Sequence, residues 1–203
     1  MLTIPKLHRS RRQQAGNSLI VVLSVLTLLV LGGFAAMRSA DTGNVISGNF
    51  AFQQAATHAS DRALTDALNN LSNIVTAGGG NADVANRYAA VRATALDARG
   101  IPSALNWATV ACTDEVGGAV GNCATDAGNF RVQYFIERLC SANPVLTDTD
   151  DIRAKCEYEP SPTATTTTLA NEIGLRYRVL IRVQGPRGTE GWYEALVSGP
   201  ASS

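Results

Sequence analysis

The chain is poor in the residues on which most enzymatic and metal sites depend. It has only two histidines, and its four cysteines include no Cys-x-x-Cys pair, the close ligand spacing typical of zinc sites. It contains no Gly-x-Ser-x-Gly motif, and the glycines at 78–80 are not followed by the Lys-Ser or Lys-Thr of a phosphate-binding loop. We therefore expect no catalytic residue, no metal site and no cofactor, and a protein that is not an enzyme.

An excess of charge of either sign is also absent. The 203 residues include 17 basic and 17 acidic side chains, whereas a general nucleic-acid-binding protein carries a marked basic excess. Four of the basic residues, Lys6, Arg9, Arg11 and Arg12, come before the first apolar stretch, which leaves 13 basic against 17 acidic residues in the remainder. We expect no nucleic-acid partner, a basic leader and a mildly acidic body.

One long uncharged stretch is present, from Leu19 to Met37. Its 19 residues read LIVVLSVLTLLVLGGFAAM, close to the roughly 20 apolar residues that cross a bilayer as a helix. The arginines before it place the N-terminus in the cytoplasm by the positive-inside rule. A cleaved secretory signal begins similarly, but its apolar run is usually about 7–15 residues and ends at a small-x-small site before a polar break. We expect a retained membrane helix, with the residues beyond Arg38 outside the cytoplasm.

The four cysteines all follow the apolar stretch, at Cys112, Cys123, Cys140 and Cys156. Their spacing favours disulfides over free or metal-bound thiols, which indicates an oxidising compartment such as a periplasm. The sequence does not choose among the three pairings that four cysteines allow. We expect Cys112 to pair with Cys123 and Cys140 with Cys156, because each pair closes a short local loop.

A second helical pattern follows the apolar stretch at residues 50–74, where apolar side chains recur at helical spacing. Residues 41–49 lie between the two and are rich in poor helix formers, so we expect a long helix that is weakened or locally unwound there. The glycines at 78–80 end the helix, and residues 83–96 are predicted to form another. The predicted buried stripe consists of Phe52, Ala55, Ala56, Ala59, Ala63, Leu64, Ala67, Leu68, Leu71 and Ile74.

Strand patterns come late in the chain. Residues 129–139, 175–183 and 190–197 alternate apolar and polar side chains, and the last two are predicted to form a hairpin. Arg176, Arg178 and Arg182 share one face; we expect them to line the open face of the sheet rather than to bind an acidic partner or DNA. The segment 161–168, SPTATTTT, predicts an exposed loop, with a glycan-bearing loop as the alternative. The fold class is α+β, with a long N-terminal helix packed on a small antiparallel sheet.

This order of parts resembles a type IV pilin precursor. The basic leader, residues 6–16, is similar to those that prepilin peptidase recognises, with Gly16 just before the expected cut. The resemblance implies cleavage between Gly16 and Asn17 and methylation of the new amino terminus at Asn17.

Within the pilins, the chain is most similar to the minor pilin group called PilX. The similarity covers roughly residues 11–75 and 170–198 and is absent between them. It lies in Met37-Arg38-Ser39, in the run from Asn49 to Ala56, and in the C-terminal run from Arg176-Tyr177-Arg178-Val179 to Gly185-Pro186-Arg187-Gly188.

The resemblance implies four parts: a leader at 1–16, a transmembrane and assembly helix at 17–38, an amphipathic helix at 39–76 and a periplasmic head at 77–203. It implies a structural subunit for initiation, tip formation or assembly of a type IV pilus, first held in the inner membrane and then carried in the fibre on the cell surface. The expected partners are prepilin peptidase, other minor and major pilins, the inner-membrane assembly platform and the membrane itself.

Two residues depart from the pilin pattern. Major pilins carry a glutamate at the fifth mature position, and here that position is Val21; Asn17 stands where phenylalanine or methionine is commoner. The missing glutamate suits a rare subunit at or near the tip. Gly32 and Gly33 form either a flexible point or a close-packing site in the membrane helix. The alternatives to a minor pilin are a type II secretion pseudopilin and a signal-anchored periplasmic module for binding or adhesion.

Overall fold

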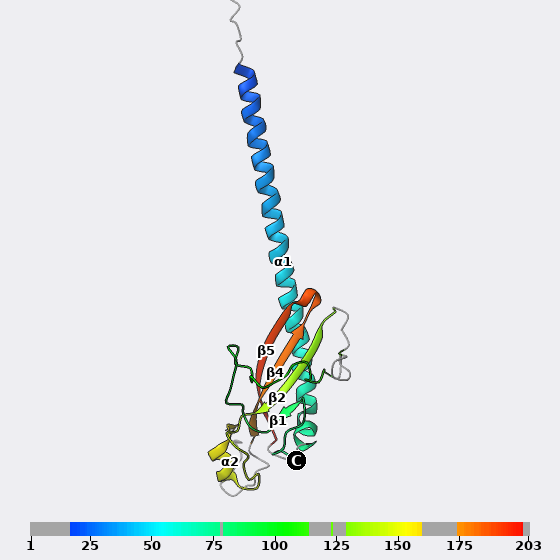
Figure 1. Ribbon diagram of the computed structural model, residues 1–203, viewed down its shortest axis with the longest axis vertical. Coiled ribbons are helices and arrows are strands. Elements are labelled where there is room, and N and C mark those ends of the chain that lie inside the picture. The colour runs from blue at the N-terminus through cyan, green and yellow to red at the C-terminus, as the bar shows by residue number, and fades with distance from the viewer. Residues whose placement is uncertain (1–16, 78, 114–122, 124–128, 160–173, 201–203) are drawn as a thin grey trace, which may run out of the picture. The chain divides into compact units, whose positions relative to one another are not determined.

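The computed structural model describes residues 17–77, 79–113, 123, 129–159 and 174–200. It contains one long helix, α1 (Asn17–Ala77), one short helix, α2 (Thr149–Lys155), and a sheet of five strands (Figure 1). The chain is therefore α+β. By its internal contacts it divides into two units, residues 1–50 and residues 51–203, of which the second is called the head below.

The first unit contains the beginning of α1. The helix continues through residues 41–49, so of the two expected alternatives, a weakened or a locally unwound helix, local unwinding is not observed. Gly43 and Gly48 each lower helix stability by only about 1 kcal/mol relative to alanine, whereas the hydrogen-bonded turns on both sides make propagation through them cooperative. The hydroxyl of Thr42 donates to the carbonyl of Arg38 at 2.9 Å and so stays within the helix.

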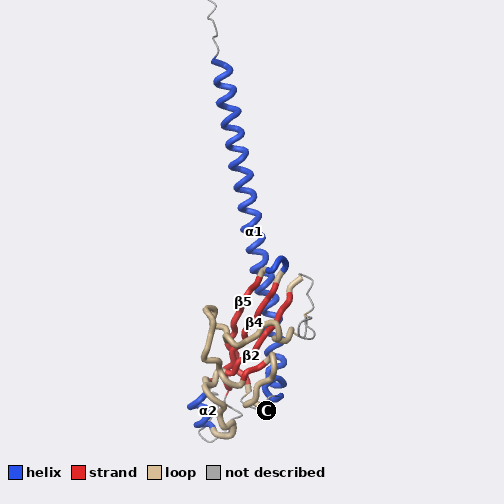
Figure 2. Tube along the Cα trace, viewed as in Figure 1, coloured by secondary structure: helices blue, strands red, loops and turns tan. Residues whose placement is uncertain are grey.

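The head contains the sheet, in the order β1-β2-β4-β3, with β5 on the other edge of β4 (Figure 2). The strands are β1 (Tyr88–Ala89), β2 (Arg131–Arg138), β3 (Tyr158–Glu159), β4 (Gly174–Gln184) and β5 (Glu190–Gly199). The predicted strand and hairpin are confirmed. The prediction of a purely antiparallel sheet is wrong for one pair, because β1 runs parallel to β2 while β2, β3 and β5 are antiparallel to β4.

One face of the sheet packs on the second half of α1. The helix contributes a narrow stripe of small side chains at intervals of three and four residues, which allows the sheet to approach closely. Leu68, predicted to be buried, is 46% exposed, since it lies to one side of this stripe. The stripe consists of Ala56, Ala59, Ala63, Ala67, Leu71 and Val75, and the facing core residues of β2 and β4 are Val132, Tyr134, Ile136, Leu175, Tyr177, Val179, Ile181 and Val183.

The other face of the sheet is covered by residues 90–113. The amide of Ala93 donates to Glu137 on β2, Gln133 donates to the carbonyl of Val110, and Arg178 on β4 donates to the carbonyl of Gly100. This cover corrects the expectation of an open, solvated arginine row: Arg178 is only 8% exposed. The alternation within the strands predicts which side chains share a face, but it does not predict that another segment of the chain covers that face.

Residues 83–96 form turns and β1 instead of the predicted helix. Asn86 has a φ of 61°, a left-handed conformation that interrupts an α-helix. Val84 forms a bridge with Tyr88, and the Asp83 carboxylate accepts from the amide of Ala90 at 2.8 Å. Arg87 donates to backbone carbonyls of Tyr134 and Cys112. These tertiary contacts outweigh a weak local helix preference.

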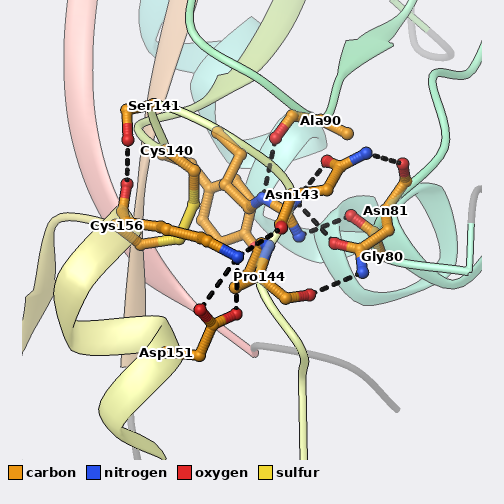
Figure 3. Close-up of a disulfide and its surroundings, with 12 residues drawn as sticks. Gly80, Asn81, Ala90, Cys140, Ser141, Asn143, Pro144, Asp151 and Cys156 are labelled. Atoms are coloured by element: carbon orange, nitrogen blue, oxygen red, sulfur yellow. Dashed lines mark hydrogen bonds and ion pairs between the residues drawn. A yellow bond between two sulfur atoms is a disulfide. The ribbon is translucent and has the colours of Figure 1, made fainter. Parts of the chain in front are cut away.

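Two disulfides lie in the head, and they join the expected pairs: Cys112 to Cys123 and Cys140 to Cys156. The second closes the segment that contains α2 (Figure 3). Asp148 caps this helix by accepting from the amides of Asp150 and Asp151. Asp150 and Asp151 occupy the first turn of α2.

Candidate functional site

Most of the exposed large apolar side chains that the structure describes lie in the first part of α1. Every large apolar side chain from Leu19 to Met37 is at least half exposed, and Val21 and Met37 are 58% and 69% exposed. Within the described residues, α1 is the one helix long and apolar enough to cross a membrane, a property of its length and composition. Such a surface has no favourable partner in water, so lipid or other apolar helices are what it can bind.

The polar side chains within this stretch are satisfied inside the helix. The hydroxyls of Ser24 and Thr27 donate to the carbonyls of Ile20 and Leu23, each at 2.8 Å. A hydrocarbon environment offers no other acceptor for a hydroxyl, and an unpaired polar group there is costly. The stretch is thus compatible with burial in lipid along its whole length.

The predicted site residues of this helix lie on exposed turns. A Cβ added at Gly32 or at Gly33 would meet no atom within 4 Å, so this pair leaves a bare section of backbone that a neighbouring helix can approach. Val21 lies near the start of α1, at the position where the resemblance places a glutamate. Asn17 is the first residue of α1, whereas Gly16, the leader and the loop at 161–168 lie outside the described residues.

No family model, no curated protein and no solved structure matches the chain.

The largest buried polar side chain of the head, Arg138, has structural partners. Arg138 is fully buried; it donates to the carbonyls of Ala90 and Gly80 and to the side-chain oxygens of Asn81 and Asn143. Figure 3 shows these two asparagines meeting beside the disulfide of Cys140 and Cys156. A guanidinium whose three nitrogens all donate to fixed oxygens locks loop to strand, which is a structural role.

A second buried network lies on the covered face of the sheet. Arg178 forms an ion pair with Glu137, whose side chain is 1% exposed, and also donates to the carbonyl of Gly100 at 3.0 Å. The other oxygen of Glu137 accepts from the amide of Ala93 at 2.6 Å. Sequence reasoning missed this pair: Glu137 and Arg178 fall on polar positions of two predicted strands, but nothing in the sequence indicated that these strands are neighbours.

No group of three or more His, Cys, Asp or Glu side chains within the described part of the chain is placed to hold a metal ion. His58 is exposed on α1. A groove about 560 Å³ in volume lies beside β5, lined by Leu96, Leu139, Glu157, Arg178, Glu194 and Leu196 among others.

Proposed function

We propose that the chain is a minor pilin-like structural subunit, similar to the PilX group, that takes part in initiation, tip formation or assembly of a type IV pilus. The observation that carries the proposal is α1 itself: an uncharged, exposed stretch from Leu19 to Met37 continues without a break into the helix that underlies a disulfide-bearing sheet. A single helix with these two halves suits a subunit that is held in lipid first and among other helices later.

The physical problem for such a subunit is leaving the membrane. Extraction exposes the apolar side chains of Leu19–Met37, and only equivalent surfaces of neighbouring subunits can replace the lipid. The bare backbone at Gly32 and Gly33 gives adjacent helices a place of close approach. Val21 carries no charge, so this subunit cannot pair a carboxylate at that position with a neighbour's amino terminus. This favours a place at the end of a fibre over a place in its shaft.

Intact-mass measurement and N-terminal sequencing of the protein from membranes test the proposal. They are made in cells with an active prepilin peptidase and in matched cells with an inactivated one. The expected result is a chain that begins at methylated Asn17 only when the peptidase is active. The variant Gly16→Leu, made in the active strain, is expected to retain its leader.

Two outcomes would overturn the proposal. A chain that begins at Met1 in both strains is a signal-anchored protein, and its head is then the functional part. A cut beyond Met37 in both strains would make the chain a secreted domain without a membrane helix.

A further inference from the structure

In the part of the head that the structure describes, the sheet ends in a long strand, β5, that is paired along one edge. β5 pairs with β4 over ten consecutive residues, from Glu190 opposite Gln184 to Gly199 opposite Leu175. β2 and β3 occupy the opposite edge of β4. Among the strands that the structure describes, β4 is the sole partner of β5. The outer backbone groups of β5 are therefore available to a further strand.

This edge lacks most of the features that usually prevent strand addition. Natural edge strands carry charged side chains, especially lysine, or proline or a bulge, or are short. β5 has ten residues, contains neither lysine nor proline, and keeps a continuous register with β4. Pro200 lies just beyond its end. Of its two acidic side chains, Glu190 is held by Arg182 and Gln184, which leaves Glu194 as the exposed charge.

A groove beside this strand is suited to side chains of an added segment. Leu196 on β5 is 57% exposed and Leu96 in the covering loop is 47% exposed, and both line the groove together with Glu194. The other charges there are satisfied: Arg92 pairs with Glu157 at 3.0 Å, and Arg178 pairs with Glu137. Within the described residues Glu194 has no hydrogen bond or ion pair. On β5 itself the groove thus offers one apolar position, Leu196, and one acidic position, Glu194, two residues apart.

A second copy of β5 fits this edge poorly. In an antiparallel pair, opposite residues share a face, and like charges that lie opposite or diagonal to each other are destabilising. If the symmetry centre of the pair lies at any residue from Trp192 to Ala195, Glu194 lies opposite or diagonal to Glu194 or Glu190 of the other copy. Centring the pair on Leu196 separates the glutamates but draws Pro200 into the ladder. The edge therefore favours a strand of different sequence, with a basic residue opposite Glu194.

We propose that β5 is a docking edge for an extended segment of a partner protein, which adds to the sheet as an antiparallel strand. Its outer side chains would be an apolar residue opposite Leu196 and a lysine or arginine opposite Glu194. Main-chain hydrogen bonds supply the affinity in this mode of recognition, and the two side-chain positions supply the specificity. The inference concerns the head alone, so it stands or falls separately from the processing of the leader.

The test uses the full chain in detergent micelles and a blocked synthetic peptide, Thr-Val-Leu-Val-Lys-Val-Thr, whose lysine and leucine match the two positions. Binding is measured by fluorescence anisotropy, and its location by hydrogen exchange of the amides of residues 190–199. The expected result is saturable binding that slows exchange in β5. The lysine of the peptide lies across from Glu194 on the neighbouring strand, and the two charges attract. Glu194→Lys replaces this attraction with repulsion and is expected to weaken binding about fivefold.

The matched control is Asp61→Lys, which changes the net charge equally on an exposed position of α1, the helix on the other side of the sheet. It is expected to leave binding unchanged. A peptide with glutamate in place of lysine is expected to bind the Glu194→Lys variant better than the unaltered chain, which also shows that this variant folds. Absence of protection in β5, an equal loss in both variants, or protection of β5 that depends on protein concentration alone would overturn the proposal.

Discussion

Glu137 and Arg178 are the acidic and basic side chains most deeply paired in the head. The side chains are 1% and 10% exposed, so water does little to screen their attraction. Each also satisfies a backbone group of the covering segment, at Ala93 and Gly100. The pair therefore fastens residues 90–113 to the sheet, and its loss affects both layers.

Glu137→Leu is expected to destabilise the head by about 3–5 kcal/mol, because it leaves a buried guanidinium without its carboxylate. The double change Glu137→Leu with Arg178→Leu is expected to cost less than the single one, since no unpaired charge remains. Denaturant unfolding, followed by the fluorescence of Trp107 and Trp192, measures both. Arg153→Leu is the control: its ion pair with Asp150 is exposed, and its loss is expected to cost at most about 0.5 kcal/mol. An equal cost for Glu137→Leu and Arg153→Leu would contradict the prediction.

Tyr88 links the core to alkaline stability. Burial raises the pKa of its phenol from 10.0 to about 12; Arg138 opposes the shift and Asp83 adds to it. The phenol donates to the carbonyl of Gly80 at 3.0 Å, which only the protonated form can do. Burial also raises the pKa of Tyr177, whose ring centre lies 6.4 Å from that of Tyr88.

The fold binds the Tyr88 proton more tightly than the unfolded chain does. The corresponding stability is complete below pH 10.0 and is lost as the pH rises through about 12. Tyr88→Phe is expected to reduce this alkaline loss, measured as the shift of the denaturation midpoint with pH alongside phenolate absorbance. Tyr158→Phe, at a half-buried position on β3, is expected to leave the loss in place. If both variants lose the same stability at alkaline pH, groups other than Tyr88 cause the loss.

At the scale of elements, α2 is the part most dependent on its surroundings. A helix of seven residues is too short to persist alone. It is held by the Asp148 cap, by the buried side chain of Ile152, by the ion pair of Lys155 with Asp151 at 2.8 Å, and by the disulfide that joins the two ends of its segment.

Replacing Cys140 and Cys156 together by serine is expected to destabilise this segment by about 3 kcal/mol, the chain-entropy value for a loop of this length. Hydrogen exchange is expected to become faster first in residues 141–157, while the β4 amides near Val179 stay protected. Serine replacement of Cys112 and Cys123 is the control and is expected to leave α2 unchanged. Unaltered exchange in 141–157 after loss of the Cys140–Cys156 bond would contradict the prediction.

The elements also show which parts of the fold local patterns specify. The second half of α1 and the hairpin of β4 and β5 were predictable, because their residues repeat with the period of a helix or a strand over many positions. Residues 83–96 were not, since their conformation depends on Asn86 and on distant partners such as Tyr134. The helix does not unwind at 41–49, because weak propensities do not overcome the cooperativity of a long helix.

The same distinction applies to the candidate sites. The exposed apolar part of α1 follows from composition alone, so the sequence was sufficient to find it. The groove at β5 brings Leu96 together with Glu194 and Leu196, residues about a hundred positions apart, and no local pattern links them. The buried Glu137 and Arg178 depend in the same way on a covering segment that packs from elsewhere in the chain.

At the scale of the whole molecule, one segment of the described chain is long and apolar enough to act as a membrane anchor. The stretch Leu19–Met37 contains twelve Leu, Ile, Val and Phe residues. At about −0.3 to −0.6 kcal/mol each on an insertion scale, they favour the membrane by roughly 4–7 kcal/mol, and an arginine at the centre of the helix opposes insertion by about 3 kcal/mol. One central arginine therefore leaves insertion favourable, whereas two bring it close to zero.

The double variant Leu26→Arg with Leu29→Arg is accordingly expected to lose retention in membranes, while Leu26→Arg alone is expected to keep most of it. Alkaline carbonate extraction, followed by comparison of pellet and supernatant, measures the difference. The control is Val45→Arg with Ile46→Arg, two exposed positions of α1 beyond the uncharged stretch, where the same added charge is expected to change nothing. Equal retention of both double variants would mean that the head or a partner holds the chain at the membrane, and that Leu19–Met37 acts only in contacts between helices.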